Sequence, residues 1–276
     1  MPMRIIMLGD VVGQPGRRVV HQQLPHIRDR YTPDLILANA ENIAGGSGIT
    51  PQLYQKMISY GIDGLTLGDH VYKRKEITAT LDQVDNLIRP ANLPAKAAGK
   101  GVMTLTARPG RAAAGATLTV VTLLGRTYMP MAADDPFAVI DRLLEGLTPD
   151  AGPVIVEIHA EATGEKIALA RYLDGRVAAV VGTHTHIATA DAGLLPRGTA
   201  YITDLGMCGP YDSVIGRRAD RIIQHMTTSM PTPFDVAEDD PRLCGVFIEV
   251  NDAGHAAQIE RIELKADLDQ PPFADN

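Results

Sequence analysis

The sequence contains no tryptophan, and only 4% of its 276 residues are aromatic. Proteins that bind single-stranded nucleic acid stack the bases on aromatic side chains, so this scarcity argues against such a binding platform. The net charge of −7 and the pI near 5.6 point the same way, because non-specific binding to DNA or to anionic membranes requires a basic surface. We therefore expect no stable nucleic-acid partner.

Other absences bear on the cell compartment. The two cysteines, Cys208 and Cys244, are too few for a disulfide framework. No apolar stretch approaches the roughly 18 residues of a membrane-spanning helix. The first residues also lack the charged segment and apolar core of a signal peptide. These features predict a cytoplasmic protein that has no membrane partner.

Short apolar runs alternate with helical patterns along the chain, which is typical of a layered α/β fold. Strands are expected at residues 4–8, 35–38, 65–67, 102–106, 117–123, 154–158, 177–181, 245–250 and 258–264, and helices at 15–30, 51–61, 135–144 and 164–172. The strands at 102–106 and 117–123 are expected to form a hairpin that starts a second sheet, and the last two strands a second hairpin. One domain is expected over residues 1–266, followed by a frayed tail at 267–276.

Polar side chains follow five of the expected strands at the point where each strand ends. They are Asp10, Glu41 with Asn42, Asp69 with His70, His159, and the pair His184 and His186. In an open parallel sheet the carboxyl ends of the strands face one edge, so these side chains are expected to gather there. Three carboxylates, an amide and four imidazoles suit a pair of divalent metals better than a single ion.

Each of these residues also has a structural interpretation. Asp10 could cap the next helix, Asn42 could be a turn residue, and His159 could be a hydrogen-bonded core histidine. Glu41 is the stronger candidate, because a carboxylate after a fully buried strand requires a partner or a metal. Cys208 has no base-and-orienter arrangement around it in the sequence, so we interpret it as a small buried residue and not as a nucleophile.

The strand-end residues lie in five motifs, which are Gly9-Asp10-Val11-Val12-Gly13, Ala40-Glu41-Asn42, Gly68-Asp69-His70, His159-Ala160-Glu161-Ala162-Thr163 and Gly182-Thr183-His184-Thr185-His186. Together they resemble the YmdB-like metallophosphoesterases, which belong to the calcineurin-like phosphoesterase superfamily. The resemblance continues through Arg89-Pro90-Ala91-Asn92 to Gly209-Pro210-Tyr211-Asp212-Ser213, and so covers nearly the whole chain.

The resemblance implies a four-layer α/β/β/α sandwich that holds two divalent or mixed-valence metal ions, commonly iron or manganese, with magnesium and zinc as alternatives. By position, one metal would be held by Asp10, Glu41, Asn42 and His186, and the other by Glu41, Asp69, His159 and His184. Glu41 would bridge the two metals. His70 would be the catalytic histidine beside the scissile phosphate.

The sequence departs from the family at one of these ligands. The usual family triplet is Gly-Asn-His, whereas this chain has Gly68-Asp69-His70. A carboxylate keeps an oxygen in the ligand position and adds one negative charge. We therefore expect metal binding to be retained, with an effect on metal preference and rate.

The sequence predicts a dinuclear metal-dependent phosphodiesterase that hydrolyses cyclic nucleotides, either 2',3' or 3',5', with a metal-bridged hydroxide as the nucleophile and His70 as the acid. The expected partner is a small phosphodiester, and the formation of a homo-oligomer is left open. One alternative is a metal-dependent amidohydrolase, which also uses a His-x-His pair, although normally on the first strand. Another is a metal-bound regulatory or nucleotide-sensing module without significant turnover.

Overall fold

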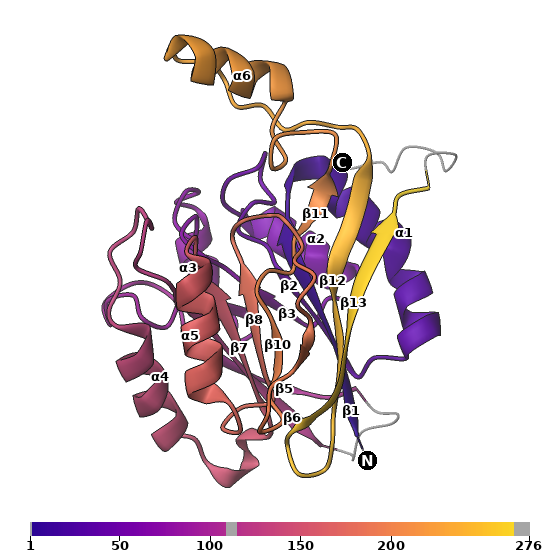
Figure 1. The fold of residues 1–276 in the computed structure, drawn as a ribbon, viewed down its shortest axis with the longest axis vertical. Coiled ribbons are helices and arrows are strands. Elements are labelled where there is room, and N and C mark those ends of the chain that lie inside the picture. The colour runs from indigo at the N-terminus through magenta and orange to yellow at the C-terminus, as the bar shows by residue number, and fades with distance from the viewer. Residues whose placement is uncertain (1, 109–114, 268–276) are drawn as a thin grey trace.

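Two β-sheets pack face to face, and helices cover both outer surfaces (Figure 1). The computed structural model describes residues 2–108 and 115–267. Within them, one sheet has seven strands in the order β13-β12-β11-β1-β2-β3-β4, and the other has six in the order β5-β6-β7-β8-β10-β9. In Figure 1, α1 lies to the right of the sheets, and α4 and α5 lie to the left.

The strands of the first sheet are β1 (Met3–Val11), β2 (Leu35–Asn39), β3 (Gly64–Thr66), β4 (Leu87–Ile88), β11 (Met207–Pro210), β12 (Pro241–Val250) and β13 (Ala256–Lys265). Those of the second sheet are β5 (Val102–Thr106), β6 (Thr117–Leu124), β7 (Val154–His159), β8 (Ala179–Thr183), β9 (Gly193–Leu194) and β10 (Ala200–Ile202). The helices are α1 (Gly13–Tyr31), α2 (Pro51–Ser59), α3 (Ile77–Gln83), α4 (Pro136–Glu145), α5 (Thr163–Leu173) and α6 (Ala219–Thr228), with a short 3-10 helix η1 (Pro149–Ala151).

Successive side chains of a strand point to opposite faces of the sheet, so each central strand contributes apolar side chains to two different layers of the core. On β1, Ile6 and Leu8 join the hydrophobic cluster that contains α1, α2 and α3, whereas Ile5 and Met7 join the cluster between the two sheets. On β6, Val120 faces that same central cluster, and Val121 joins the cluster beneath α4 and α5. Three apolar interfaces between four layers confirm the predicted α/β/β/α sandwich.

Both predicted hairpins are present. β5 pairs antiparallel with β6 at one edge of the second sheet, and β12 pairs antiparallel with β13 at one edge of the first. The predicted start of α2 is also confirmed, because the Leu53 N–H donates to Oγ1 of Thr50 at 3.3 Å and Pro51 takes the first helical position. Part of the turn between β5 and β6 and nearly all of the predicted frayed tail lie outside the described residues.

Several boundaries differ from the sequence-based expectation. The strand expected at 177–181 is β8 (Ala179–Thr183), because its parallel ladder with β7 continues to the pairs Ile158 with Gly182 and His159 with Thr183. Gly182 and Thr183 are not apolar, so the hydrophobic run gave no sign of that extension. Asp10 lies inside β1, paired with Met207 of β11, and does not follow the strand as expected.

Candidate metal centre

The strand-end side chains of the two sheets meet at one edge of the sandwich. Asp10 lies at the end of β1, Glu41 and Asn42 follow β2, Asp69 and His70 follow β3, His159 ends β7, and His184 and His186 follow β8. These strands run parallel within their sheets, so their carboxyl ends open on the same side. The hydrogen bonds and ion-pair distances among these residues show that the structure brings all eight predicted site residues together.

One group consists of Glu41, Asp69, His159 and His184, whose ligand atoms all lie within 4.8 Å of one another. Nε2 of His159 lies 3.2 Å from Oε1 of Glu41 and 3.1 Å from Oδ1 of Asp69. Nδ1 of His184 lies 3.4 Å from that same Asp69 oxygen. Four nitrogen and oxygen donors that converge in this way can be ligands of one divalent ion.

A second group adjoins the first through Glu41. Asp10 is fully buried, and its Oδ1 has no hydrogen-bond partner among the described residues. That oxygen lies 3.9 Å from Nε2 of His186, and Nδ2 of Asn42 lies 3.1 Å from the same histidine nitrogen. Nδ2 of Asn42 is also 3.3 Å from Oε1 of Glu41. A buried carboxylate oxygen without a donor is costly, and a cation at this position would satisfy it.

In each of the three candidate ligand histidines, His159, His184 and His186, one ring nitrogen contacts an acceptor outside the centre. Nδ1 of His159 donates to Oγ1 of Thr183 at 2.9 Å, and Nδ1 of His186 donates to the Ile215 carbonyl oxygen at 2.9 Å. Nε2 of His184 lies 3.2 Å from Oε2 of Glu161. These contacts leave the other nitrogen of each ring directed inward, where it can offer a lone pair to an ion, which is how metal-ligating histidines are held in proteins.

The charges of the group also fit a cation. Burial raises the pKa of Asp10 to about 7. Burial would lower the pKa of His159, but the Glu41 carboxylate and the hydrogen bond to Asp69 outweigh it and raise that pKa well above its usual value. The carboxylates of Glu41 and Asp69 thus stabilise positive charge at this position, as they would stabilise a bound cation. The donor set and its charge fit metal binding, and the prediction of a metal site is supported.

The backbone of the His-x-His turn is strained. His184 has φ 98° and His186 has φ 66°, and positive values are uncommon for residues other than glycine. The N–H of Thr185, between them, donates to Oδ2 of Asp204 at 3.1 Å. Nζ of Lys166 lies 2.7 Å from that oxygen, and both partners of this ion pair are fully buried. The buried ion pair therefore holds the turn that presents two ligands.

His70 and Asn42 are coupled through a short hydrogen bond. Nδ1 of His70 lies 2.6 Å from Oδ1 of Asn42, and Nε2 lies 3.7 Å from Oδ2 of Asp69. Burial lowers the pKa of His70, against the opposing effect of Glu41 and Asp69. Asn42 thus turns its nitrogen, and not its oxygen, toward His186. To act as the predicted oxygen ligand, the Asn42 amide must rotate by half a turn.

A depression of about 330 Å³ opens on these residues, and His70, Glu161, His184 and Arg217 are among those that line it. The Arg217 guanidinium donates to the carbonyl oxygens of Gly46 and Phe234. Gly46 has φ 83°, and a Cβ there would lie 2.4 Å from Arg217 Nη1, so this close approach requires glycine.

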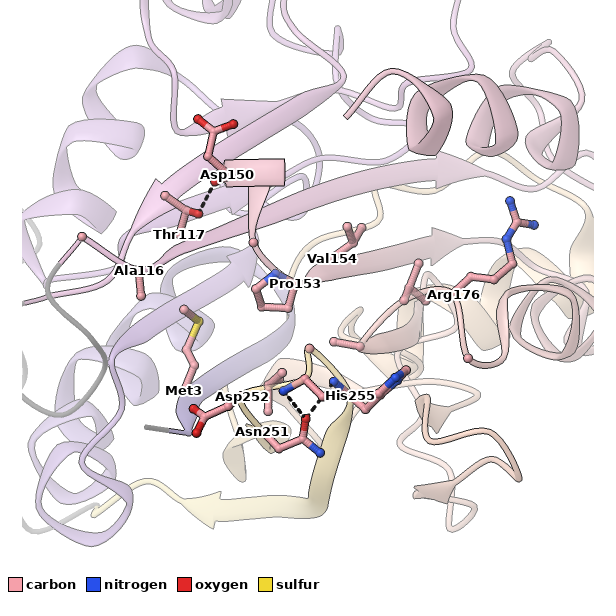
Figure 2. Close-up of a pocket in the computed structure, with 18 residues that line it drawn as sticks. Met3, Ala116, Thr117, Asp150, Pro153, Val154, Arg176, Asn251, Asp252 and His255 are labelled. Atoms are coloured by element: carbon pink, nitrogen blue, oxygen red, sulfur yellow. Dashed lines mark hydrogen bonds between the residues drawn. The ribbon is translucent and has the colours of Figure 1, made fainter. Parts of the chain in front are cut away.

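A wider depression of about 640 Å³ lies at the other end of the sheets (Figure 2). It is lined by residues at or next to the starts of β1, β6 and β7, such as Met3, Thr117 and Val154, and by the turn between β12 and β13 that contains His255. The clustered ligands all lie at the opposite, carboxyl ends of these strands. We therefore place the functional site at the metal centre and not in this depression.

Several residues that support the centre were not among the predicted site residues. Glu157 is fully buried and accepts hydrogen bonds from Thr183 at 2.6 Å and from Asn39 at 2.7 Å. Because Oγ1 of Thr183 in turn contacts Nδ1 of His159, Glu157 helps to orient that histidine. A carboxylate within the apolar run 154–158 was a signal that could have revealed it. Glu161, Lys166 and Asp204 lie in loop or helix segments whose local pattern does not distinguish them from surface residues.

Several known proteins are similar to this chain in sequence over nearly its full length. A family model described as YmdB-like protein matches residues 6–262. The chain belongs to the YmdB-like family. One family relative, the 2',3'-cyclic-nucleotide 2'-phosphodiesterase of Bacillus subtilis (strain 168), is 44% identical over 266 residues, which cover 96% of this chain and 98% of the relative.

Two solved structures agree with the YmdB-like assignment. A hypothetical protein from Thermus thermophilus superposes with a TM-score of 0.87 at 42% identity and covers 95% of this chain and 99% of its own. A novel phosphatase from Mycoplasma pneumoniae superposes with a TM-score of 0.88 at 32% identity and covers 96% of this chain and 94% of its own. With the metal-binding group, these relatives make this YmdB-like chain a metal-dependent phosphoesterase.

Among residues 2–108 and 115–267, no helix is both long enough and apolar enough to cross a membrane.

Proposed function

We propose that the chain hydrolyses 2',3'-cyclic nucleotides at a centre of two metal ions and breaks the ester bond to the 2' oxygen. The observation that carries this proposal is the arrangement of two ligand groups that share Glu41, with the unpaired Oδ1 of Asp10 in the second group. The name of the Bacillus subtilis relative supports the choice of substrate.

In this proposal the ligands divide as their contacts suggest. Asp69, His159 and His184 would hold one ion, Asp10, Asn42 and His186 would hold the other, and Glu41 would contribute to both. Bound metal ions supply Lewis acidity, which acidifies a water molecule and compensates charge on the phosphoryl oxygens. Iron or manganese is the proposed metal, with magnesium and zinc as alternatives, because the mixed imidazole and carboxylate donors accept all four.

His70 is proposed as the group that donates a proton to the leaving oxygen or stabilises its charge. The rotation that turns Oδ1 of Asn42 toward the second ion also turns Nδ2 toward Nδ1 of His70. An N–H donated to Nδ1 makes that nitrogen an acceptor, so the histidine is then neutral and can stabilise charge on the leaving oxygen through its Nε2–H. Asn42 would thus bind metal and fix the His70 tautomer in one conformation. Full proton transfer requires an imidazolium, whose Nδ1–H is accepted by Oδ1 of Asn42 in the orientation observed.

The buried network behind the ligands keeps this arrangement in place. Thr183 and Glu157 hold His159, and Glu161 holds His184, so neither imidazole needs to reorient when an ion binds. An enzyme is favoured over a nucleotide-sensing module because the named relatives are a phosphodiesterase and a phosphatase. The amidohydrolase alternative has no such support.

The test is product analysis with the manganese-reconstituted protein. Adenosine 2',3'-cyclic phosphate should give adenosine 3'-monophosphate, and chelation of the metal should stop the reaction. Faster hydrolysis of the 3',5'-cyclic isomer would redirect the proposal to that substrate. Nucleotide binding without turnover under any metal would contradict the proposal and favour a sensing module.

A further inference from the structure

The adjacent residues Asp69 and His70 line two different depressions. The first, of about 330 Å³, contains His70 and opens on the metal centre. The second, of about 470 Å³, is lined by Asp69, Tyr72, Lys73, Pro130, Met131 and Ala132. Because adjacent residues line the two, we expect a ligand whose phosphate lies at the centre to reach the second depression. Each volume lies within the range of about 300–1,000 Å³ that is usual for small-molecule sites.

The walls of the second depression suit a flat aromatic ring. Tyr72 is half-buried, and its hydroxyl donates to the Ala98 carbonyl oxygen at 2.6 Å, which fixes the ring. Met131 packs against the same hydrophobic cluster as Tyr72. A nucleobase can stack on a tyrosine ring, and an unbranched thioether side chain adapts its shape to such a partner.

The charge at the mouth of this depression suits an anion. Lys73 is exposed, and no ion pair between described residues involves it. The chain as a whole has a net charge of −7, so the exposed lysine places a positive charge beside the metal centre of an otherwise acidic protein. Such a cation raises the local concentration of an anionic ligand.

We propose that the second depression is the nucleoside subsite of the enzyme, and that the base of a cyclic nucleotide lies against Tyr72 and Met131 while its phosphate lies at the metal centre. This inference rests on the proposed function. It implies that the enzyme distinguishes cyclic nucleotides from cyclic phosphodiesters that have no base. The base contacts should therefore contribute to substrate affinity.

The test compares adenosine 2',3'-cyclic phosphate with glycerol 1,2-cyclic phosphate, a five-membered cyclic diester without a base. The measured quantity is the ratio of their kcat/KM values. Met131→Ala should lower this ratio about ten-fold, the usual effect of a lost apolar contact in a substrate pocket. Met131→Leu conserves volume and should restore the ratio. The matched control is Met226→Ala, because Met226 is 74% exposed and lines neither depression.

An unchanged ratio in a folded Met131→Ala variant, or an equal fall with both substrates, would overturn the subsite. If the wild-type protein hydrolyses neither substrate, the proposed function fails, and equilibrium binding then decides the subsite separately. Weaker binding of adenosine 3'-monophosphate by Met131→Ala, with inorganic phosphate bound as in the wild type, would support the subsite. Equal binding of the nucleotide by both proteins would overturn it.

Discussion

The buried ion pair between Lys166 and Asp204 provides a quantitative test of how the His-x-His turn is held. Lys166→Met removes the charge and keeps most of the side-chain volume. Asp204 then remains buried with two backbone donors, the N–H groups of Gly206 at 2.8 Å and Thr185 at 3.1 Å. Removing one partner of a buried pair costs about 3–5 kcal/mol, because the other charge is left uncompensated.

We expect the lower end of that range, about 3 kcal/mol, since the two remaining donors continue to stabilise the carboxylate. Arg176→Met is the matched control. Its ion pair with Asp141 has the same N–O distance of 2.7 Å, but the two side chains are 37% and 33% exposed. Solvent screens such a pair, so its loss should cost about 1 kcal/mol or less.

Urea unfolding followed by circular dichroism measures both free energies. The same variants should differ in manganese affinity measured by calorimetry, because Asp204 also restrains Thr185 between His184 and His186. Lys166→Met should bind the metal more weakly, and Arg176→Met should bind it as the wild type does. Equal destabilisation by the two substitutions, or unchanged metal affinity in Lys166→Met, would refute the reasoning.

Three further outcomes are expected. Glu41→Gln should abolish turnover and keep the fold by circular dichroism, because an amide cannot compensate charge on two ions; near wild-type turnover would show that Glu41 is not shared. His70→Ala should keep its metal content by elemental analysis yet lose about 10²–10⁴ in rate, less with a nitrophenyl leaving group; loss of metal would make His70 a ligand. Burial raises the pKa of Cys208 well above its usual value and that of Cys244 to about 11, so neither thiol should react with iodoacetamide at pH 8 until the protein is unfolded; rapid labelling of the native protein would contradict this.

The gathering of the site residues could be predicted because it depends on a general rule. Parallel strands place their carboxyl ends at one edge, and hydrophobic runs reveal the strands. Glu41 and His159 could be placed at this edge in this way from their sequence positions. The same reasoning placed Asp10 just beyond its strand, but β1 continues to Val11 because its pairing with β11 extends the ladder.

Other parts of the site depend on contacts between distant segments, which no local pattern reveals. The Ile215 carbonyl that fixes the tautomer of His186 is 29 residues away in the chain, and Lys166 meets Asp204 across 38 residues. The orientation of the Asn42 amide depends on hydrogen bonds to His70 and His186. Helix α6 had no expected counterpart, although Ile222, Ile223 and Met226 have helical spacing; of these three residues only Ile222 is buried.

The number of metal ions per chain tests the central claim most directly. Two ligand groups that share Glu41 predict two ions per chain when protein purified without chelator is measured by elemental analysis. Asp10→Ala should reduce the ratio to one, because the unpaired Oδ1 of Asp10 lies beside His186 of the second group. A ratio of one in the wild-type protein that persists after reconstitution with manganese or iron would contradict the two-metal centre.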